Sequence, residues 1–172
     1  QDVLGYASNI PEVTYGLGFR TSYKNLQFSM LFQGASKFSI YINGPAASMF
    51  SNGSIPLSYQ YKYAWQPNPN DPSVNINPDA QLPAASISAN SNNSRISDFW
   101  LRDVRYLRLK NINLSYNIPK NILSKIGVKS TQIYFATENL ITWTNLGIYK
   151  NTFDPEFDPN TKYRITRSSG KI

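Results

Sequence analysis

Apolar and polar side chains alternate with a period of two along two neighbouring stretches at the start of the chain. The first stretch, about 14–24, carries its larger side chains at odd positions, namely Tyr15, Leu17, Phe19, Thr21 and Tyr23. The second, about 26–42, begins with Leu26, Phe28, Met30 and Phe32 at even positions. A period of two predicts β-strands with one apolar face and one small or polar face. The Lys24-Asn25 pair between them predicts a tight hairpin.

Two further strands are predicted later in the chain, at about 103–118 and 129–143. In the earlier one, Ile112, Leu114 and Tyr116 alternate with polar residues, but Leu107 and Leu109 have the opposite parity. Either a β-bulge near Lys110–Asn111 or an inward-facing apolar pair explains this change of phase. The segment after Pro119 predicts a short connection with apolar residues at helical spacing, before the next strand begins.

The connections between these strands alternate in length. A tight turn is followed by residues 44–98, which are rich in Pro, Asn, Ser and Ala and include one short helical segment before Trp65. A short turn and then another long loop follow. A loop as long as 44–98 argues against a compact soluble domain. The second strand is also far longer than the usual five or six residues or so of soluble strands. Transmembrane β-barrels have long strands and alternate short periplasmic turns with long extracellular loops.

Composition excludes several classes of protein. The 172 residues contain no Cys and no His. A disulfide scaffold, most zinc sites and any Cys- or His-based catalytic site are therefore excluded. No apolar run is long enough for a transmembrane helix. The net charge is +7, but the basic residues are scattered apart from Arg102, Arg105, Arg108 and Lys110. The sequence predicts neither an enzyme nor a bound metal or cofactor.

Five segments carry motifs in a fixed order. They are IPEVTYGLGFRTSYKNLQFSMLFQG at 10–34, Trp65 followed by NPN at 68–70, SDFWLRDVRYLRLKNINLSYNIP at 97–119, IYFATENLITWT at 133–144 and FDPEF at 153–157. Together they resemble the SusC/RagA family of TonB-dependent outer-membrane receptors, over roughly residues 10–167. The departures are a spacing one residue shorter after Trp65 and, at the last strand, Arg164 where the family has Pro. A last strand at about 163–172 is therefore expected to be truncated or altered.

The resemblance implies an all-β fold, the C-terminal portion of a 22-stranded antiparallel transmembrane β-barrel in the bacterial outer membrane. This chain, 1–172, would supply four to five strands with long extracellular loops, and the plug domain would be absent from it. The function implied is TonB-dependent import of glycan or oligopeptide nutrients. The implied partners are a SusD-like surface lipoprotein, TonB through the plug region, and outer-membrane lipid.

An aromatic group in the long loop is the candidate contact for cargo or for the lid lipoprotein. Its members are Tyr59, Tyr61, Tyr63 and Trp65. Aromatic rings stack on sugar rings, but the same rings can also pack the loop against itself or form a girdle at the outer membrane interface.

Two charged groups invite other interpretations. The cationic group, Arg102, Arg105, Arg108 and Lys110, suggests an anionic ligand or nucleic acid. Nucleic-acid binding, however, requires a basic surface interleaved with stacking aromatic side chains. Polar residues facing a barrel interior, or cations meeting lipid headgroups at the rim, explain the group better. The acidic group Asp154, Glu156, Asp158 and Asn160 begins like a calcium loop, but Pro159 and Ile165 occupy the positions where an EF-hand needs Gly and Glu. Turn formation by the Asp-Pro pairs is the expectation.

A soluble, secreted β-sandwich that binds carbohydrate is the alternative. It predicts that the apolar strand faces meet between two packed sheets. A barrel wall predicts one apolar band on a single curved sheet. The directions of Leu17, Phe19, Phe28, Met30, Phe32, Leu114 and Tyr116 separate the two.

Overall fold

The computed structural model describes residues 8–50, 53, 55–87, 92–93, 95 and 97–156. The chain divides into two compact units. One contains residues 11–37 and 104–145, and the other contains the described parts of 1–10, 38–103 and 146–172. The predicted strand at 163–172 lies outside the described residues. Within the described residues, no helix combines the length and apolar character needed to cross a membrane.

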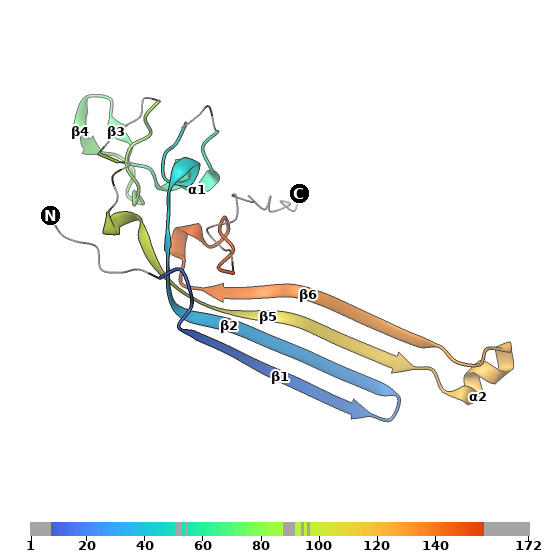
Figure 1. Cartoon of the computed structure of the whole chain (residues 1–172). Helices are drawn as coiled ribbons and strands as arrows, with labels where there is room; N and C mark the ends of the chain where they lie inside the picture. The colour runs from blue at the N-terminus through green and yellow to red at the C-terminus, as the bar shows by residue number, and fades with distance from the viewer. Residues whose placement is uncertain are drawn as a thin grey trace. The chain divides into compact units, whose positions relative to one another are not determined.

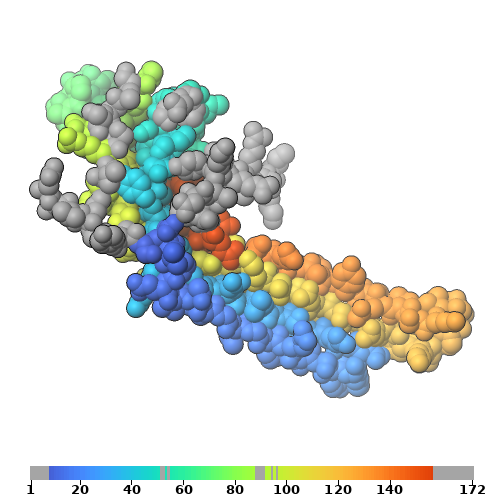
Figure 2. Space-filling model, in the orientation of Figure 1, coloured from blue at the N-terminus to red at the C-terminus, as the bar shows by residue number. Residues whose placement is uncertain are grey.

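Four long strands form one sheet. They are β1 (Val13–Tyr23), β2 (Leu26–Tyr41), β5 (Leu101–Asn117) and β6 (Gln132–Thr144), in the order β1-β2-β5-β6. β1 pairs antiparallel with β2, and β5 pairs antiparallel with β6. The strands run side by side in Figure 1, and their side chains form a continuous surface in Figure 2. The sequence-based ranges 14–24, 26–42, 103–118 and 129–143 overlap these strands with differences of up to three residues at the ends.

The hairpin between β1 and β2 has the predicted position. Tyr23 pairs with Leu26, so only Lys24 and Asn25 turn the chain. Lys24 has a φ of 53°, in the left-handed region that two-residue hairpins require. The turn fixes the register, and every odd residue of β1 consequently faces the same side as an even residue of β2, from Tyr23–Leu26 to Tyr15–Gly34.

The ladder between β5 and β6 contains one irregularity. Asn117 to Asn111 pair in register with Gln132 to Glu138, and Leu109 then pairs with Ile141. β6 therefore holds one more residue than β5 at this point, opposite Lys110. Asn139 has a φ of 51°, as a bulge residue often does. The extra residue is on β6, and β5 itself alternates without a bulge at Lys110–Asn111. Of the two explanations that the sequence left open, the pairing therefore supports the second, in which Leu107 and Leu109 form an apolar pair on the otherwise polar face.

A short helical connection joins β5 to β6. It consists of α2 (Lys120–Leu123) and a 3₁₀ turn at Ser124–Ile126. Gly127 ends the turn with a φ of 73°, and Val128 N–H donates to the Leu123 carbonyl at 3.1 Å. A backbone bond of 3.0 Å from Ile118 N–H to the Thr131 carbonyl extends the ladder beyond the strands, so the connection is a direct continuation of the sheet.

The other unit is built from the long loop segments. It contains α1 (Ser58–Tyr63), the two-stranded sheet of β3 (Pro67–Asn68) and β4 (Asp71–Asn75), and 3₁₀ turns at Gly44–Ala46, Asp98–Trp100 and Gly147–Tyr149. The sequence predicted a short helix within 44–98 but not the β3–β4 pair. The buried side chains of this unit include Phe38, Ile42, Tyr59, Leu82, Trp100 and Tyr149.

Candidate functional site

One face of the four-stranded sheet carries an apolar band. Asn117 N–H donates to the Asn25 carbonyl at 2.9 Å, which sets Leu26 beside Tyr116 on the same face. Leu17 is 69% exposed, far more than a core leucine would be. The pairings place the following on this face: Leu17, Phe19, Phe28, Met30, Phe32, Ile112, Leu114, Tyr116, Ile133 and Phe135. All seven residues chosen to separate a barrel from a sandwich therefore share one face of one sheet, and this arrangement does not favour the sandwich alternative.

The side chains on the opposite face are mostly small or polar in the part of the sheet near the short turns. It carries Gly16, Gly18, Arg20, Ser22, Gln27, Ser29, Gln33, Asn113, Ser115, Asn117, Gln132, Ala136 and Glu138, together with Leu31 and Tyr134. An apolar face that is exposed and a polar face behind it are what a wall between lipid and a water-filled interior requires. A soluble sheet with one solvated face would expose the polar side and bury the apolar one.

Above the bulge, the apolar side chains change face. Leu107 pairs with Trp143 and Leu109 with Ile141, on the same face as Asn111. These four residues therefore lie on the otherwise polar side, next to the long-loop end of the sheet. Trp143 is about half exposed. Sequence reasoning noted the change of phase at Leu107 and Leu109 but did not name Trp143 as a candidate contact.

Tyr15 ties three strands together. Its ring lies against Gly34, its partner on β2, and its hydroxyl donates to the Tyr106 carbonyl of β5 at 2.7 Å. A side chain at position 34 would overlap both the ring and that carbonyl oxygen. Glycine at 34 therefore creates the path by which a β1 side chain reaches β5.

The cationic group is divided by the structure. Arg108 is only 5% exposed, and its Nε donates to the Thr142 hydroxyl at 2.9 Å. Arg105 is exposed, and Lys110 is partly exposed. In the other unit, Arg102 lies beside the rings of Phe99 and Tyr149, at 5.8 and 5.7 Å from their centroids. Because the Arg108 guanidinium is buried, it is not part of an exposed basic surface, and the arrangement does not favour nucleic acid.

The aromatic group of the long loop does not form a single platform either. Tyr59 is buried, donates its hydroxyl to the Ala46 carbonyl at 2.6 Å, and packs edge-on against Tyr149 with ring centroids 5.1 Å apart. Tyr63 is partly exposed, with the Lys62 ammonium 5.2 Å from its ring centroid. Tyr61 is 76% exposed, and Trp65 is partly exposed. Within this group, Tyr59 holds the loop together, and Tyr61 and Trp65 are open to a contact from outside.

Burial raises the pKa of Tyr59 far above its ordinary value, and the neighbouring Tyr149 adds to the increase. Burial also raises the pKa of Tyr149, while the positive charge of Arg102 opposes that increase. Both hydroxyls consequently stay neutral over the physiological range. The Tyr59 hydroxyl donates to the Ala46 carbonyl, and the Tyr149 ring packs edge-on against the rings of Tyr59 and Phe153.

The acidic loop forms turns in its described part. Glu156 N–H donates to Asp154 Oδ1 at 2.9 Å, a local Asx-type bond. Asp158 and Asn160 lie outside the described residues. Among the described residues, no group of three or more acidic side chains is arranged to hold a metal ion.

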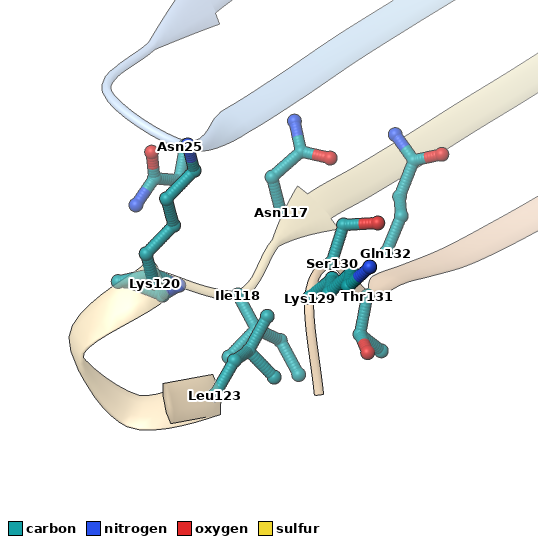
Figure 3. Close-up of a pocket in the computed structure, with 10 residues that line it drawn as sticks. Asn25, Asn117, Ile118, Lys120, Leu123, Lys129, Ser130, Thr131 and Gln132 are labelled. Carbon is teal, nitrogen blue, oxygen red and sulfur yellow. The ribbon is translucent and has the colours of Figure 1, made fainter. Parts of the chain in front are cut away.

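A pocket of about 430 Å³ lies at the short-turn end of the sheet. Figure 3 shows Asn117 and Gln132, paired across β5 and β6, pointing to one side of the strand ends, with Ile118 and Leu123 on the other side. Asn25, Lys120 and Lys129 also line the pocket, and no carboxylate is among its lining residues. Polar and apolar sides of the sheet thus remain separate to the very end of the strands.

Comparison with known proteins agrees with this geometry. No family model matches the chain. Two curated proteins of Formosa agariphila are similar: TonB-dependent receptor P26, 28% identical over 158 residues, and TonB-dependent receptor P3, 29% identical over 154 residues. Each match covers 90% of this chain but only 14% and 13% of the relative. The chain therefore spans about one seventh of the length of these relatives.

Solved structures show the same fold. The RagAB peptide importer in its closed-closed state matches 80% of this chain and 14% of that chain, with a TM-score of 0.53 and 19% identity. A structure of the RagAB peptide transporter matches 81% and 14%, with a TM-score of 0.54 and 18% identity. The fold of this chain therefore agrees with a segment of these larger β-barrel chains.

Proposed function

We propose that this chain is a segment of a TonB-dependent outer-membrane receptor of the SusC/RagA type and forms part of the wall and outer rim of a nutrient importer. Its similarity to two TonB-dependent receptors and the fold it shares with the RagAB peptide importer support the proposal. The single observation that carries the proposal is the exposed apolar band on one face of a single sheet, with a polar face behind it. The band contacts lipid, and the polar face lines the route that cargo takes.

The proposed cargo is a glycan or an oligopeptide. The resemblance to SusC/RagA receptors supports both classes, and the name of the RagAB peptide importer supports the second. Trp143 and Leu107 give the polar face an apolar area near the long-loop end, where an aromatic ring suits either a sugar ring or an apolar peptide side chain.

The proposed partners are those of the family. TonB would act through the plug region of the receptor, and a SusD-like surface lipoprotein would cover the long-loop end. Tyr61 and Trp65 are the residues that we propose for contact with that lipoprotein or with cargo, because both are accessible and neither is the buried anchor of its loop. Tyr59 is excluded from this role by its burial.

Uptake of labelled cargo by cells tests the proposal. A strain that lacks the complete receptor is compared with the same strain carrying it, using fluorescent oligopeptides and fluorescent oligosaccharides in parallel. We expect receptor-dependent uptake of one class, abolished when the proton-motive force that drives TonB is dissipated. Uptake of both classes that is independent of the receptor would contradict the proposal.

Variants of the complete receptor then locate the contacts. Tyr61→Ala, Trp65→Ala and Trp143→Ala should each lower uptake with no loss of receptor from the outer membrane. Val74→Ala, an exposed apolar residue on β4, is the matched control. Equal uptake by all four variants would remove these residues from the proposal but leave the transport function itself untouched.

A further inference from the structure

The connection between β5 and β6 exposes apolar side chains that its own fold does not use. Ile122 is 53% exposed and Ile126 is 69% exposed, and Val128 is also exposed. Leu123 is the buried residue of α2 and packs at the strand ends. The connection therefore has one buried apolar residue at the strand ends and three exposed apolar residues.

The same connection is basic. Residues 118–131 contain Lys120, Lys125 and Lys129 and no acidic residue, and Lys24 occupies the adjacent β1–β2 turn. Aliphatic side chains beside lysines, in a segment without acidic residues, suit the boundary between acyl chains and anionic headgroups.

Aromatic residues mark this boundary on the strands themselves. Tyr23, 70% exposed, ends β1, and Tyr116 lies next to the end of β5, both on the apolar face. Tyrosine is enriched at membrane–water interfaces, where one end of the ring is apolar and the other wet. The two short turns lie immediately beyond these rings.

The apolar face continues from the sheet into the connection. Ile118 follows the parity of Ile112, Leu114 and Tyr116, and Figure 3 shows it with Leu123 on the side opposite Asn117 and Gln132. A plug in the barrel interior would meet the polar side of the sheet. The exposed isoleucines belong to a turn that is anchored on the lipid side.

We propose that residues 118–129 form an interfacial anchor, in which Ile122, Ile126 and Val128 insert into the periplasmic leaflet of the outer membrane and the three lysines bind anionic phospholipid headgroups. The inference rests on the proposed function for the membrane location and for the assignment of short turns to the periplasmic side. It adds a lipid contact site to a segment that otherwise only reverses the chain.

Site-directed fluorescence on the complete receptor tests this anchor. Ile122→Cys or Ile126→Cys is introduced into a cysteine-free receptor, labelled with an environment-sensitive dye, and reconstituted into phosphatidylethanolamine vesicles with or without phosphatidylglycerol. Spin-labelled phospholipid reports contact with lipid, and iodide reports contact with water. Leu17→Cys is the control for the lipid-facing wall, and Val74→Cys is the control for an exposed loop.

Labels at 122 and 126 should be quenched by the spin-labelled lipid, as at 17, and should be protected from iodide, unlike the label at 74. Quenching by iodide alone would place the turn in water and overturn the anchor. Protection from both quenchers would mean that protein covers the turn, which also overturns it. If the label at 17 is not quenched by lipid, the barrel assignment fails as well, so the two failures are distinguishable.

The lysines have a separate readout. Removing one positive charge near an anionic membrane surface should lower the preference for phosphatidylglycerol roughly fivefold at low salt. Lys120→Gln, Lys125→Gln and Lys129→Gln should each show this loss in native mass spectra of the lipid-bound receptor, and Lys62→Gln, in the long loop, should not. An unchanged lipid preference in all three variants would contradict the role of the lysines.

Discussion

Replacing Gly34 by alanine should destabilise the barrel wall at the point where Tyr15 crosses β2. A Cβ at position 34 would lie 2.7 Å from Cζ of the Tyr15 ring and would overlap a second ring carbon and the Tyr106 carbonyl oxygen. Neither neighbour yields easily, because the carbonyl is backbone and the ring is held by its hydrogen bond to the same oxygen.

The size of the effect follows from three contributions. Overpacking a filled site costs about 1–3 kcal/mol. Displacement of the Tyr15 ring loses a hydrogen bond that contributes about 1 kcal/mol. Alanine recovers about 0.5–1 kcal/mol, because glycine loses more backbone entropy on folding. The expected net loss for Gly34→Ala is therefore about 2 kcal/mol.

This loss can be measured by unfolding the complete receptor with urea in detergent. The folded barrel is followed by its heat-modifiable mobility on gels, and the loss of stability appears as a lower urea midpoint of unfolding. Gly16→Ala and Gly18→Ala are matched controls on β1, because their new Cβ atoms would stand 3.5 Å and 3.8 Å from the nearest atoms. Both controls should stay within about 0.5 kcal/mol of the parent.

A double variant separates the two sources of the cost. When Tyr15→Ala is combined with Gly34→Ala, the alanine at 34 no longer meets the ring, so its additional cost should fall below that of Gly34→Ala alone. The reasoning is refuted if Gly34→Ala leaves the midpoint unchanged, or if Gly16→Ala lowers it as much.

Three other predictions follow from named contacts. Leu17→Arg on the apolar face should cost about 2–4 kcal/mol in membrane insertion, and Gln33→Arg on the polar face should insert normally; equal membrane levels of the two variants would contradict the assignment of faces. Arg108→Ala should lower the free energy of unfolding by about 1–3 kcal/mol by removing its bond to Thr142, and a urea midpoint equal to that of the parent would contradict the burial of this side chain. Tyr59→Phe should cost about 1 kcal/mol at neutral pH. Because burial raises the folded-state pKa of Tyr59, the stabilisation by this residue is complete below a pH of about 10 and is lost as the pH rises further. The free energy of unfolding of the parent should therefore decline more steeply above that pH than that of Tyr59→Phe. Parallel pH curves for the two proteins would contradict the burial of Tyr59.

The sheet could be predicted from the sequence because period-two patterns and turn residues are local signals. Tyr15 to Phe32 alternate clearly, and Lys24-Asn25 fixes the hairpin, so the two strands and their shared apolar face follow directly. The change of phase after Leu109 was visible too. Of its two explanations, the apolar pair Leu107 and Leu109 on the otherwise polar face is the one that the pairing supports. The extra residue in β6 could not be predicted, because a strand's register depends on its partner as well as on its own sequence.

Contacts between distant segments account for most of what sequence reasoning missed. Tyr59 and Tyr61 are indistinguishable in a sequence, yet one is buried because Tyr149, ninety residues later, packs against its ring. The bond from Tyr15 to Tyr106 likewise joins residues that are far apart in the chain. The apolar isoleucines after Pro119 had helical spacing, but only the structure shows that they remain exposed.

On the proposed function, the extra residue of β6 also has a consequence for the depth of this segment in the bilayer. Without the bulge, Ile141 and Trp143 would lie on the same face as Phe135. The apolar, lipid-facing surface of this strand would then extend further towards the long-loop end. The bulge opposite Lys110 places them on the polar face and so ends the apolar surface of this strand at that point. A receptor that lost the bulge but kept both residues would be drawn further into the membrane, and its long loops would stand closer to the lipid surface.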